Sequence, residues 1–215
     1  MNGWLVDPPF RRLSPDRYHA GNRPDRVMPI EAVVIHYTAS LRDRPTIDWL
    51  ANQDDSYVSA HFVLSRDGTV HQLVPVTDRA IHAGGPTSRL FGRPGVNNRT
   101  IGIELMNAGF LLQRPDGAYT TASGAPYGGR VEKFDQPPLH PVTARAAPSR
   151  FWEPYSEAQI SALIDLTRRL VALFPDLAQD LERRLVGHDE VDPGRKWDPG
   201  PCFPWGPYRT GVGGR

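Results

Sequence analysis

The chain has 215 residues, a formal net charge of +1, 22 prolines, 20 glycines and a single cysteine, Cys202. This length suits one domain with its own core, and the lone cysteine excludes an internal disulfide. The balanced charge gives no electrostatic reason to expect nucleic acid or an acidic membrane surface as a partner.

The first residues show no basic start followed by an apolar core, which argues against a secretory signal. No run in the sequence approaches the ~20 apolar residues that are needed to span a bilayer. We therefore expect a soluble protein with no membrane insertion. Residues 1–29 are polar and rich in proline, and we interpret them as an N-terminal arm.

Strand-like apolar runs recur through the first half of the chain. They span residues 32–37, 59–64, 69–74 and 100–106. The dipeptide Asp67-Gly68 between the second and third runs is a strong hairpin signal. The spacing of apolar residues in 46–53 predicts the opening of a helix.

The second half contains an irregular segment and then the clearest helix. Residues 108–150 hold 11 Gly or Pro residues in 43 positions and show little periodicity, so we expect a functional loop or mobile insert. Ser156 and Gln159 match a capping box, and the apolar spacing that follows predicts a helix that Pro175 ends. The mixture of strands and helices predicts a single α/β domain with one central sheet.

The run from Gly187 to Pro201 combines reactive side chains with too much glycine and proline for a regular helix or strand. Such a composition predicts a shaped loop that carries a site. His188 and Asp198 lie in this run, and His36 ends the first apolar strand. Two imidazoles and one carboxylate can hold a zinc ion and leave a fourth position for water, so the sequence predicts a metal hydrolase.

Two further residues fit this chemistry. Lys196 lies two positions before Asp198, so in extended chain both side chains point the same way, and an ammonium there suits a developing oxyanion. Glu104 is a lone carboxylate in an apolar strand, where burial raises its pKa as a general base requires. Taken singly, these residues also suit a structural histidine, a solvent-facing glutamate, a surface lysine and a turn-forming aspartate. Only their joint arrangement favours catalysis.

Six motifs occur in order along the chain. They are Val34-Ile35-His36-Tyr37-Thr38-Ala39, Val58-Ser59-Ala60-His61-Phe62, Arg66-Asp67-Gly68-Thr69-Val70, Arg79-Ala80-Ile81-His82-Ala83-Gly84, Thr100-Ile101-Gly102-Ile103-Glu104 and the run Gly187–Pro201. Together they resemble the type 2 family of zinc-dependent N-acetylmuramoyl-L-alanine amidases, whose fold is shared by peptidoglycan-recognition proteins and phage lysozyme-amidases. The resemblance implies a central mixed β-sheet flanked by helices, with zinc at the floor of a surface groove.

The resemblance implies that His36, His188 and Asp198 are the zinc ligands, that Glu104 is the general base and that Lys196 stabilises the transition state. The implied reaction is hydrolysis of the amide bond between the lactyl carbonyl of N-acetylmuramic acid and L-alanine, in peptidoglycan or in muropeptides. The resemblance places the catalytic domain at residues 30–210, with the 108–150 segment inside it and a tail at 211–215. We expect the protein to act as a monomer.

Four residues are candidates for substrate binding. His82 resembles a residue that lines the substrate cleft of the family. Tyr37 and Trp197 are placed to stack on a sugar, and Arg99 to pair with a carboxylate of the stem peptide. A core aromatic or surface arginine is an equally good interpretation of the last three.

The segment 108–150 is longer than the family core needs. Its Tyr119, Tyr127 and Arg130 suggest a flap that covers the groove or selects the substrate.

Two rival functions stay open. Members of the wider fold that lack zinc bind peptidoglycan without cutting it, and a zinc peptidase with the same site geometry would cut inside the stem peptide. The setting is open as well: a cytoplasmic recycling enzyme fits, as does an endolysin or antibacterial effector that reaches the cell wall by phage lysis or by a dedicated secretion route.

Overall fold

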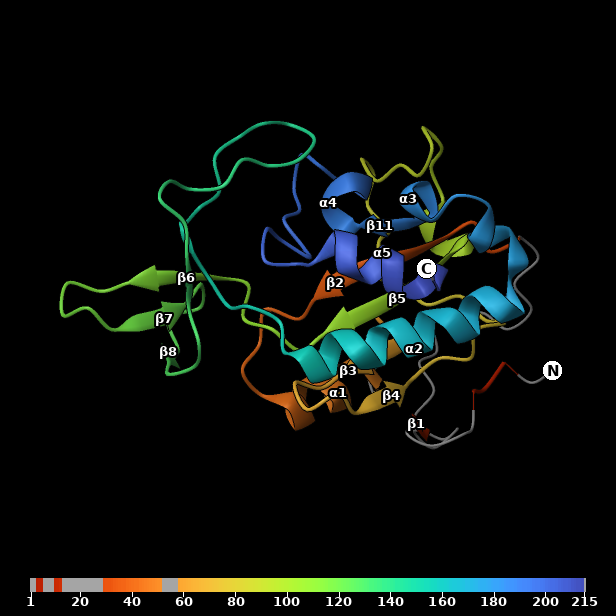
Figure 1. The fold of residues 1–215 in the computed structure, drawn as a ribbon, viewed down its shortest axis with the longest axis horizontal. Coiled ribbons are helices and arrows are strands. Elements are labelled where there is room, and N and C mark those ends of the chain that lie inside the picture. Colours follow the sequence, from red (N-terminus) through yellow and green to blue (C-terminus); the bar gives the residue numbers. More distant parts are fainter. Residues whose placement is uncertain (1–2, 6–9, 13–28, 52–57, 215) are drawn as a thin grey trace.

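The computed structural model describes residues 3–5, 10–12, 29–51 and 58–214. At its centre lies a six-stranded sheet with the order β1-β4-β3-β5-β2-β11 (Figure 1). Its strands are β1 (Phe10–Arg12), β2 (Ala32–Tyr37), β3 (Phe62–Leu64), β4 (Val70–Gln72), β5 (Thr100–Leu105) and β11 (Leu185–Gly187). In this sheet β3 and β4 pair antiparallel at the predicted hairpin, and the other neighbouring pairs are parallel. The prediction of a mixed central sheet in an α/β domain is confirmed.

Helices cover the sheet, and α2 and α5 pack against each other on one side of it (Figure 1). The helical segments are α1 (Asp43–Ala51), η2 (Val96–Asn98), α2 (Glu157–Leu173), η3 (Pro175–Gln179), α3 (Leu181–Arg184), α4 (His188–Val191) and α5 (Trp205–Gly213). Among the helices in the described ranges, none is both long and apolar enough to cross a membrane.

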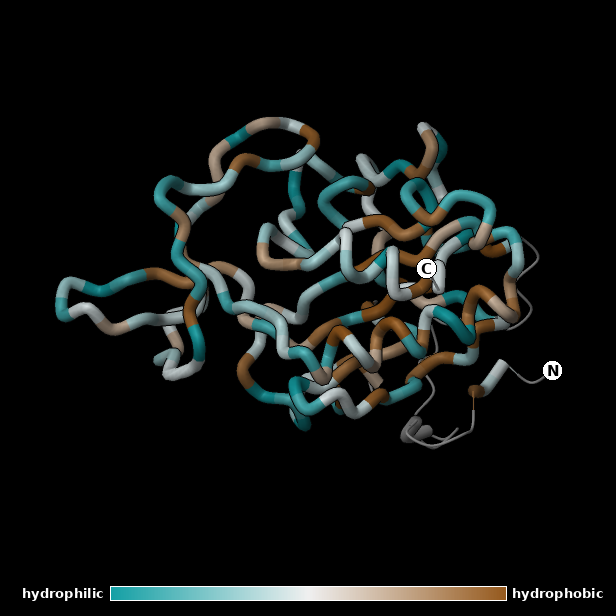
Figure 2. The backbone as a smooth tube through the Cα atoms, in the orientation of Figure 1, coloured by the Kyte–Doolittle hydropathy of each residue, from teal (hydrophilic) through white to brown (hydrophobic). Residues whose placement is uncertain are grey.

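The alternation of side chains along β2 and β5 separates the main core from the candidate site. Ile35 of β2 and Ile103 of β5 belong to the core cluster that also contains the buried leucines of α2. Figure 2 shows hydrophobic residues concentrated in these central strands and on α2. Successive strand residues point to opposite faces, so His36 and Glu104 lie on the other face. They are direct partners in the β2–β5 pairing, which makes their side chains neighbours.

The start of α2 follows the predicted capping pattern only in part. The Ser156 hydroxyl accepts a hydrogen bond from the Gln159 backbone N–H at 3.1 Å, as an N-cap does. The Gln159 side chain does not return to Ser156. It donates instead to the carbonyls of Leu64 and Met106, at 3.2 and 2.9 Å. The helix is thereby attached to the ends of β3 and β5.

The expectation of an irregular segment at residues 108–150, called the insert below, is wrong in its first half. Four strands form there and join β10, which follows the insert, in an antiparallel sheet with the order β8-β7-β6-β10-β9, whose β6–β7 hairpin projects away from the central sheet (Figure 1). Its strands are β6 (Phe110–Gln113), β7 (Tyr119–Thr121), β8 (Pro126–Tyr127), β9 (Glu132–Lys133) and β10 (Phe151–Trp152). Strands of two to four residues are too short to show a two-residue period in the sequence, which is why they escaped prediction.

Two expected boundaries lie close to regular structure. Helix α5 continues to Gly213 and so crosses the expected boundary after residue 210. In the expected arm, β1 forms the edge of the central sheet by pairing in parallel with β4, while residues 6–9 and 13–28 lie outside the described residues.

Candidate metal centre

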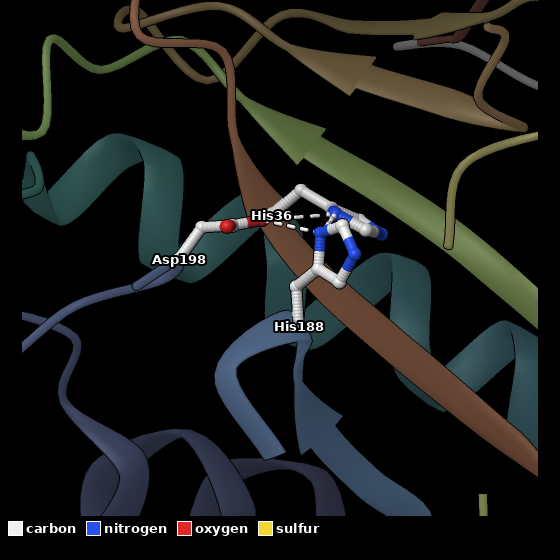
Figure 3. A group of neighbouring side chains, drawn as sticks. All are labelled: His36, His188 and Asp198. Carbon is white, nitrogen blue, oxygen red and sulfur yellow. Dashed lines mark hydrogen bonds and ion pairs between the residues drawn. The ribbon is translucent and has the colours of Figure 1, made fainter. Parts of the chain in front are cut away.

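The three expected metal ligands meet at one point on the β2–β5 face (Figure 3). His36 comes from β2, His188 is the first residue of α4, and Asp198 comes from the loop that follows. The Nδ1 atoms of the two histidines are 2.8 Å apart, and the Asp198 Oδ2 atom lies 3.0 Å from His36 Nδ1 and 2.9 Å from His188 Nδ1. All three side chains are buried.

This donor set fits a metal ion. Three atoms that carry lone pairs converge on one point, and a cation there would satisfy all of them. Their separations are a little shorter than the about 3.3 Å edge of a tetrahedron with metal bonds of about 2.0 Å. Burial, together with the nearby His188, lowers the pKa of His36 to about 4, so this ring is neutral at neutral pH as a ligand must be.

The carboxylate is also in the form that a metal requires. Burial alone would raise the pKa of Asp198, but the neighbouring His188 and His36 outweigh it and hold that pKa well below its usual range. Asp198 is therefore ionised at neutral pH. Two imidazoles and one carboxylate match the ligand sets of catalytic zinc sites, which leave one position open.

We call the run Gly187–Pro201 the ligand loop, and hydrogen bonds within it bring its two ligands, His188 and Asp198, together. The expectation that the run contains no regular helix is wrong at its start, because His188–Val191 form the single turn α4. The Glu190 carboxylate accepts from the Gly187 N–H at 2.9 Å. The Asp189 N–H donates to the Asp198 carbonyl at 2.9 Å, which brings the two ends of the loop together.

The middle of this loop is attached to the loop before β5. Asp192 is fully buried, and its carboxylate accepts from the Thr87 hydroxyl at 2.9 Å and the Ser88 hydroxyl at 3.3 Å. Arg195 Nε also donates to Asp192 at 2.9 Å. These contacts lower the pKa of Asp192 despite its burial, so the carboxylate stays charged and keeps its partners.

Glu104 lies beside the ligands in an environment that favours its neutral form. Its Oε2 atom is buried and has no hydrogen-bond partner among the described residues. Burial, and then the charge of Asp198, raise the pKa of Glu104 to about 8, while Lys196 opposes them. The half-buried Lys196 also lowers the pKa of His36. The charge of Lys196 therefore acts on both residues, as expected for a side chain directed at the site.

The structure places His82 directly behind His36. Its Nδ1 atom lies 3.0 Å from His36 Nε2, and its Nε2 atom lies 3.1 Å from the Thr100 hydroxyl. The Thr100 hydroxyl in turn donates to the Val96 carbonyl at 2.8 Å. His82 is only 8% exposed. Its ring lies against β5 at Gly102, where any Cβ would clash with it.

Tyr37 and Trp197 lie near the ligands. Tyr37 is half-buried at the end of β2, and burial together with the charges of Asp198, Asp189 and Glu104 raises its pKa. Trp197 lines a cavity of about 160 Å³ next to the ligand loop. Both positions are compatible with contact to a substrate, which stays a prediction.

The structure contradicts the expectation that Arg99 meets the substrate. Arg99 precedes β5, so it lies at the opposite end of the strand from Glu104. Its side chain is 2% exposed, and both terminal nitrogens of its guanidinium group donate hydrogen bonds within the protein. They contact Glu31 at 2.6 Å and the carbonyls of Leu90, Arg93 and Pro94 at 3.1–3.3 Å. Arg99 therefore holds the loop before β5 together.

Sequence reasoning missed Thr100, although a signal for it was available. Thr100, Gly102 and Glu104 are two residues apart in one strand and therefore share a face. No comparable signal pointed to His140, which lies in the insert and contacts the ligand loop at Lys196.

Comparison with known proteins identifies the family. Residues 26–201 match the family model described as N-acetylmuramoyl-L-alanine amidase. The 1,6-anhydro-N-acetylmuramyl-L-alanine amidase AmpD of Escherichia coli (strain K12) is 32% identical over 155 residues, which make up 72% of this chain. The chain spans little more than half of that relative, 58% of its length.

Two solved structures have the same fold. A crystal structure of a selenomethionine derivative of AmpD superposes with a TM-score of 0.64 at 24% identity, covering 99% of this chain and 98% of the other. The N-acetylmuramyl-L-alanine amidase AmiD from E. coli, in complex with the substrate anhydro-N-acetylmuramic acid-L-Ala-D-gamma-Glu-L-Lys, gives a TM-score of 0.58 at 28% identity. That match covers 88% of this chain and 58% of AmiD. With a family model that matches most of its length, the chain belongs to the N-acetylmuramoyl-L-alanine amidase family, whose members are enzymes that hydrolyse the amide bond between N-acetylmuramic acid and L-alanine.

Proposed function

We propose that this protein is a zinc-dependent amidase that cuts muropeptides between the lactyl group of N-acetylmuramic acid and L-alanine. The observation that carries the proposal is the convergence of His36, His188 and Asp198 within 3.0 Å of one another. A zinc ion held there would polarise the substrate carbonyl and lower the pKa of a water molecule to about 7.

Glu104 is the proposed general base. It lies next to His36 across the β2–β5 pair, so its carboxylate would face a water molecule held at the ligand cluster. With a pKa of about 8, raised by burial and by Asp198, it can take a proton from the water and return it to the leaving amine near neutral pH. A cation among the ligands lowers this pKa and favours the basic form.

Lys196 is the proposed partner of the oxyanion. Attack on the amide carbonyl places negative charge on its oxygen, and a fixed ammonium in a water-poor site stabilises that charge. The charge of Lys196 acts on both Glu104 and His36, which supports a position of the ammonium over the ligand cluster.

His82 is proposed to orient His36 and need not touch the substrate. When His36 Nδ1 is the ligand atom, the hydrogen of the neutral ring lies on Nε2 and is donated to His82 Nδ1. His82 then carries its own hydrogen on Nε2 and donates it to Thr100, whose hydroxyl donates to Val96. The hydrogen bonds thus form a chain in which each side chain donates to the next, from His36 to the Val96 carbonyl. Such partners fix the tautomer of a metal-binding histidine and are important for affinity.

The proposed substrate class is soluble muropeptides that carry a 1,6-anhydro sugar. The support comes from the relatives, since AmpD is named for this sugar and the AmiD complex contains an anhydro-N-acetylmuramic acid peptide. A soluble substrate fits an enzyme that acts in the cytoplasm, which cell fractionation would test. That the enzyme is a monomer stays a prediction.

Product analysis tests the proposed reaction. The protein is incubated in parallel with a soluble anhydro-muropeptide and with intact sacculi, and the products are read by mass spectrometry. We expect an intact peptide that begins with L-alanine, released faster from the soluble substrate. Cuts inside the peptide would indicate a zinc peptidase, and binding without any cut would indicate a recognition module.

A further inference from the structure

The second half of the insert, residues 134–149, contacts the ligand loop at the backbone of Lys196. We call these residues the insert loop; it arches over from the projecting hairpin to the loop after α4 (Figure 1). The Lys196 carbonyl lies 3.0 Å from His140 Nε2, and an Arg145 guanidinium nitrogen donates to it at 3.2 Å. Two side chains of the insert loop therefore share one carbonyl of the ligand loop.

The direction of the histidine contact follows from the other ring nitrogen. His140 Nδ1 lies 3.2 Å from the backbone N–H groups of Val142 and Thr143, so it must accept. Neutral imidazole has one donor nitrogen and one acceptor nitrogen. His140 Nε2 therefore carries the hydrogen and donates it to Lys196. The ring is 1% exposed, so water does not compete for these bonds.

The same two side chains enclose the next residue, Trp197. The Arg145 guanidinium carbon lies 4.4 Å from the centre of the indole ring, and the His140 ring meets the indole edge-on at 4.9 Å. The tip of the insert loop is itself closed. The His140 N–H donates to the Arg145 carbonyl at 2.8 Å, and the Ala144 N–H donates to the His140 carbonyl at 2.9 Å. The contact is therefore between a hydrogen-bonded loop tip and two adjacent residues of the ligand loop, Lys196 and Trp197.

The contact completes the anchoring of Lys196. Its N–H already donates to the Asp192 carbonyl at 2.9 Å, so the insert loop fixes the peptide group on the other side. A lysine side chain has four flexible carbons, and only a fixed backbone can aim its ammonium reproducibly. The charge of Lys196 acts on both Glu104 and His36, which indicates that its ammonium lies near both side chains.

We propose that His140 and Arg145 are positioning residues that act on the reaction through Lys196. The inference rests on the role of Lys196 in the proposed function. It makes the insert loop part of the catalytic apparatus, in addition to any part that the insert plays in covering or selecting substrate.

Substitutions can remove each contact with little other change. His140→Asn keeps an acceptor near the Nδ1 position and loses the donor to Lys196, whereas His140→Gln keeps a donor near the Nε2 position. Arg145→Met keeps packing on Trp197 without a donor. Arg150→Met is the matched control, because Arg150 also lies over an aromatic ring, at 5.1 Å from that of Phe151, but donates to the Asp135 carbonyl.

The expected result is a loss in kcat with little change in KM. We expect His140→Asn combined with Arg145→Met to lower kcat roughly tenfold or more, since small misplacements of catalytic groups are costly. Zinc affinity should stay within about threefold, because none of the ligands is touched. Arg150→Met and His140→Gln should stay near the parent rate.

A double-mutant cycle with Lys196→Met decides whether the effect passes through Lys196. In the Lys196→Met background the pair of substitutions should cause no further loss of kcat, since coupled residues are non-additive. Losses that add, or a rise in KM alone, would overturn the proposal.

Hydrogen exchange of residues 192–198 reads the contact without reference to activity. Exchange of these amide hydrogens should accelerate in the double variant His140→Asn with Arg145→Met, but not in Arg150→Met. Unchanged exchange in the double variant would also overturn the proposal. Full activity of Lys196→Met alone would instead remove the role assigned to Lys196, while the exchange result would still report the contact.

Discussion

Replacing Glu104 by glutamine in the metal-free protein should remove a pH-dependent cost to stability. Burial and the charge of Asp198 raise the pKa of Glu104 from 4.5 to about 8. Below pH 4.5 the folded and unfolded chains are both protonated at this group. Between pH 4.5 and 8 the unfolded chain loses its proton while the folded chain keeps it, so the free energy of unfolding falls as pH rises.

The size of this cost follows from the shift. At about 1.36 kcal/mol per pKa unit, the full shift corresponds to about 5 kcal/mol above pH 8. The Glu104 side chain retains partial access to solvent, so we take about half of that value. Between pH 5 and pH 8.5 the wild-type protein should lose about 2 kcal/mol relative to the Glu104→Gln variant, which does not titrate there.

Urea unfolding of both proteins in chelator, at several pH values, measures this difference. Glutamine has nearly the same shape, so any effect of packing shifts the two curves by a constant and leaves their pH dependence untouched. With zinc added, the cation should offset the cost of ionising Glu104 and flatten the difference. A difference that does not change with pH in the metal-free protein, or that changes with the opposite sign, would refute the reasoning.

Three further substitutions test the surroundings of the site. His82→Ala should weaken zinc binding about 10- to 100-fold in a chelator competition, because the partner of His36 is lost; a raised KM with unchanged zinc affinity would support a substrate contact instead. Gly102→Ala should push the His82 ring away and cost about 1–3 kcal/mol in thermal or urea unfolding, whereas Gly128→Ala, with no atom near its added Cβ, should be neutral. Arg99→Met should lower the free energy of unfolding by about 2–3 kcal/mol, since Glu31 and the three carbonyls each lose one hydrogen bond; an altered KM at unchanged stability would contradict the structural role.

The proximity of His36 and Glu104 could be predicted, because it follows from the geometry of paired strands. The apolar run that ends in His36 and the run that contains Glu104 form neighbouring parallel strands, and their register places the two side chains together. The glycines and prolines of the run Gly187–Pro201 indicated a bent loop, and the structure closes that loop with a backbone hydrogen bond between Asp189 and Asp198.

Other features depend on long-range contacts that no sequence pattern predicts. The sequence around Arg99 does not indicate its contacts with Glu31 and three backbone carbonyls, so Arg99 was wrongly expected to bind substrate. His140 reaches Lys196 across 56 positions through a backbone carbonyl, which any residue type would supply. The insert sheet is built from strands too short for periodicity.

Titration of zinc into chelated protein, with release of the peptide followed at each step, tests the central claim most directly. The reaction should be absent without metal and rise in proportion to bound zinc up to one ion per chain, and the product should be an intact peptide that begins with L-alanine. Full activity in the chelated protein, or saturation of activity without zinc bound at His36, His188 and Asp198, would contradict the account.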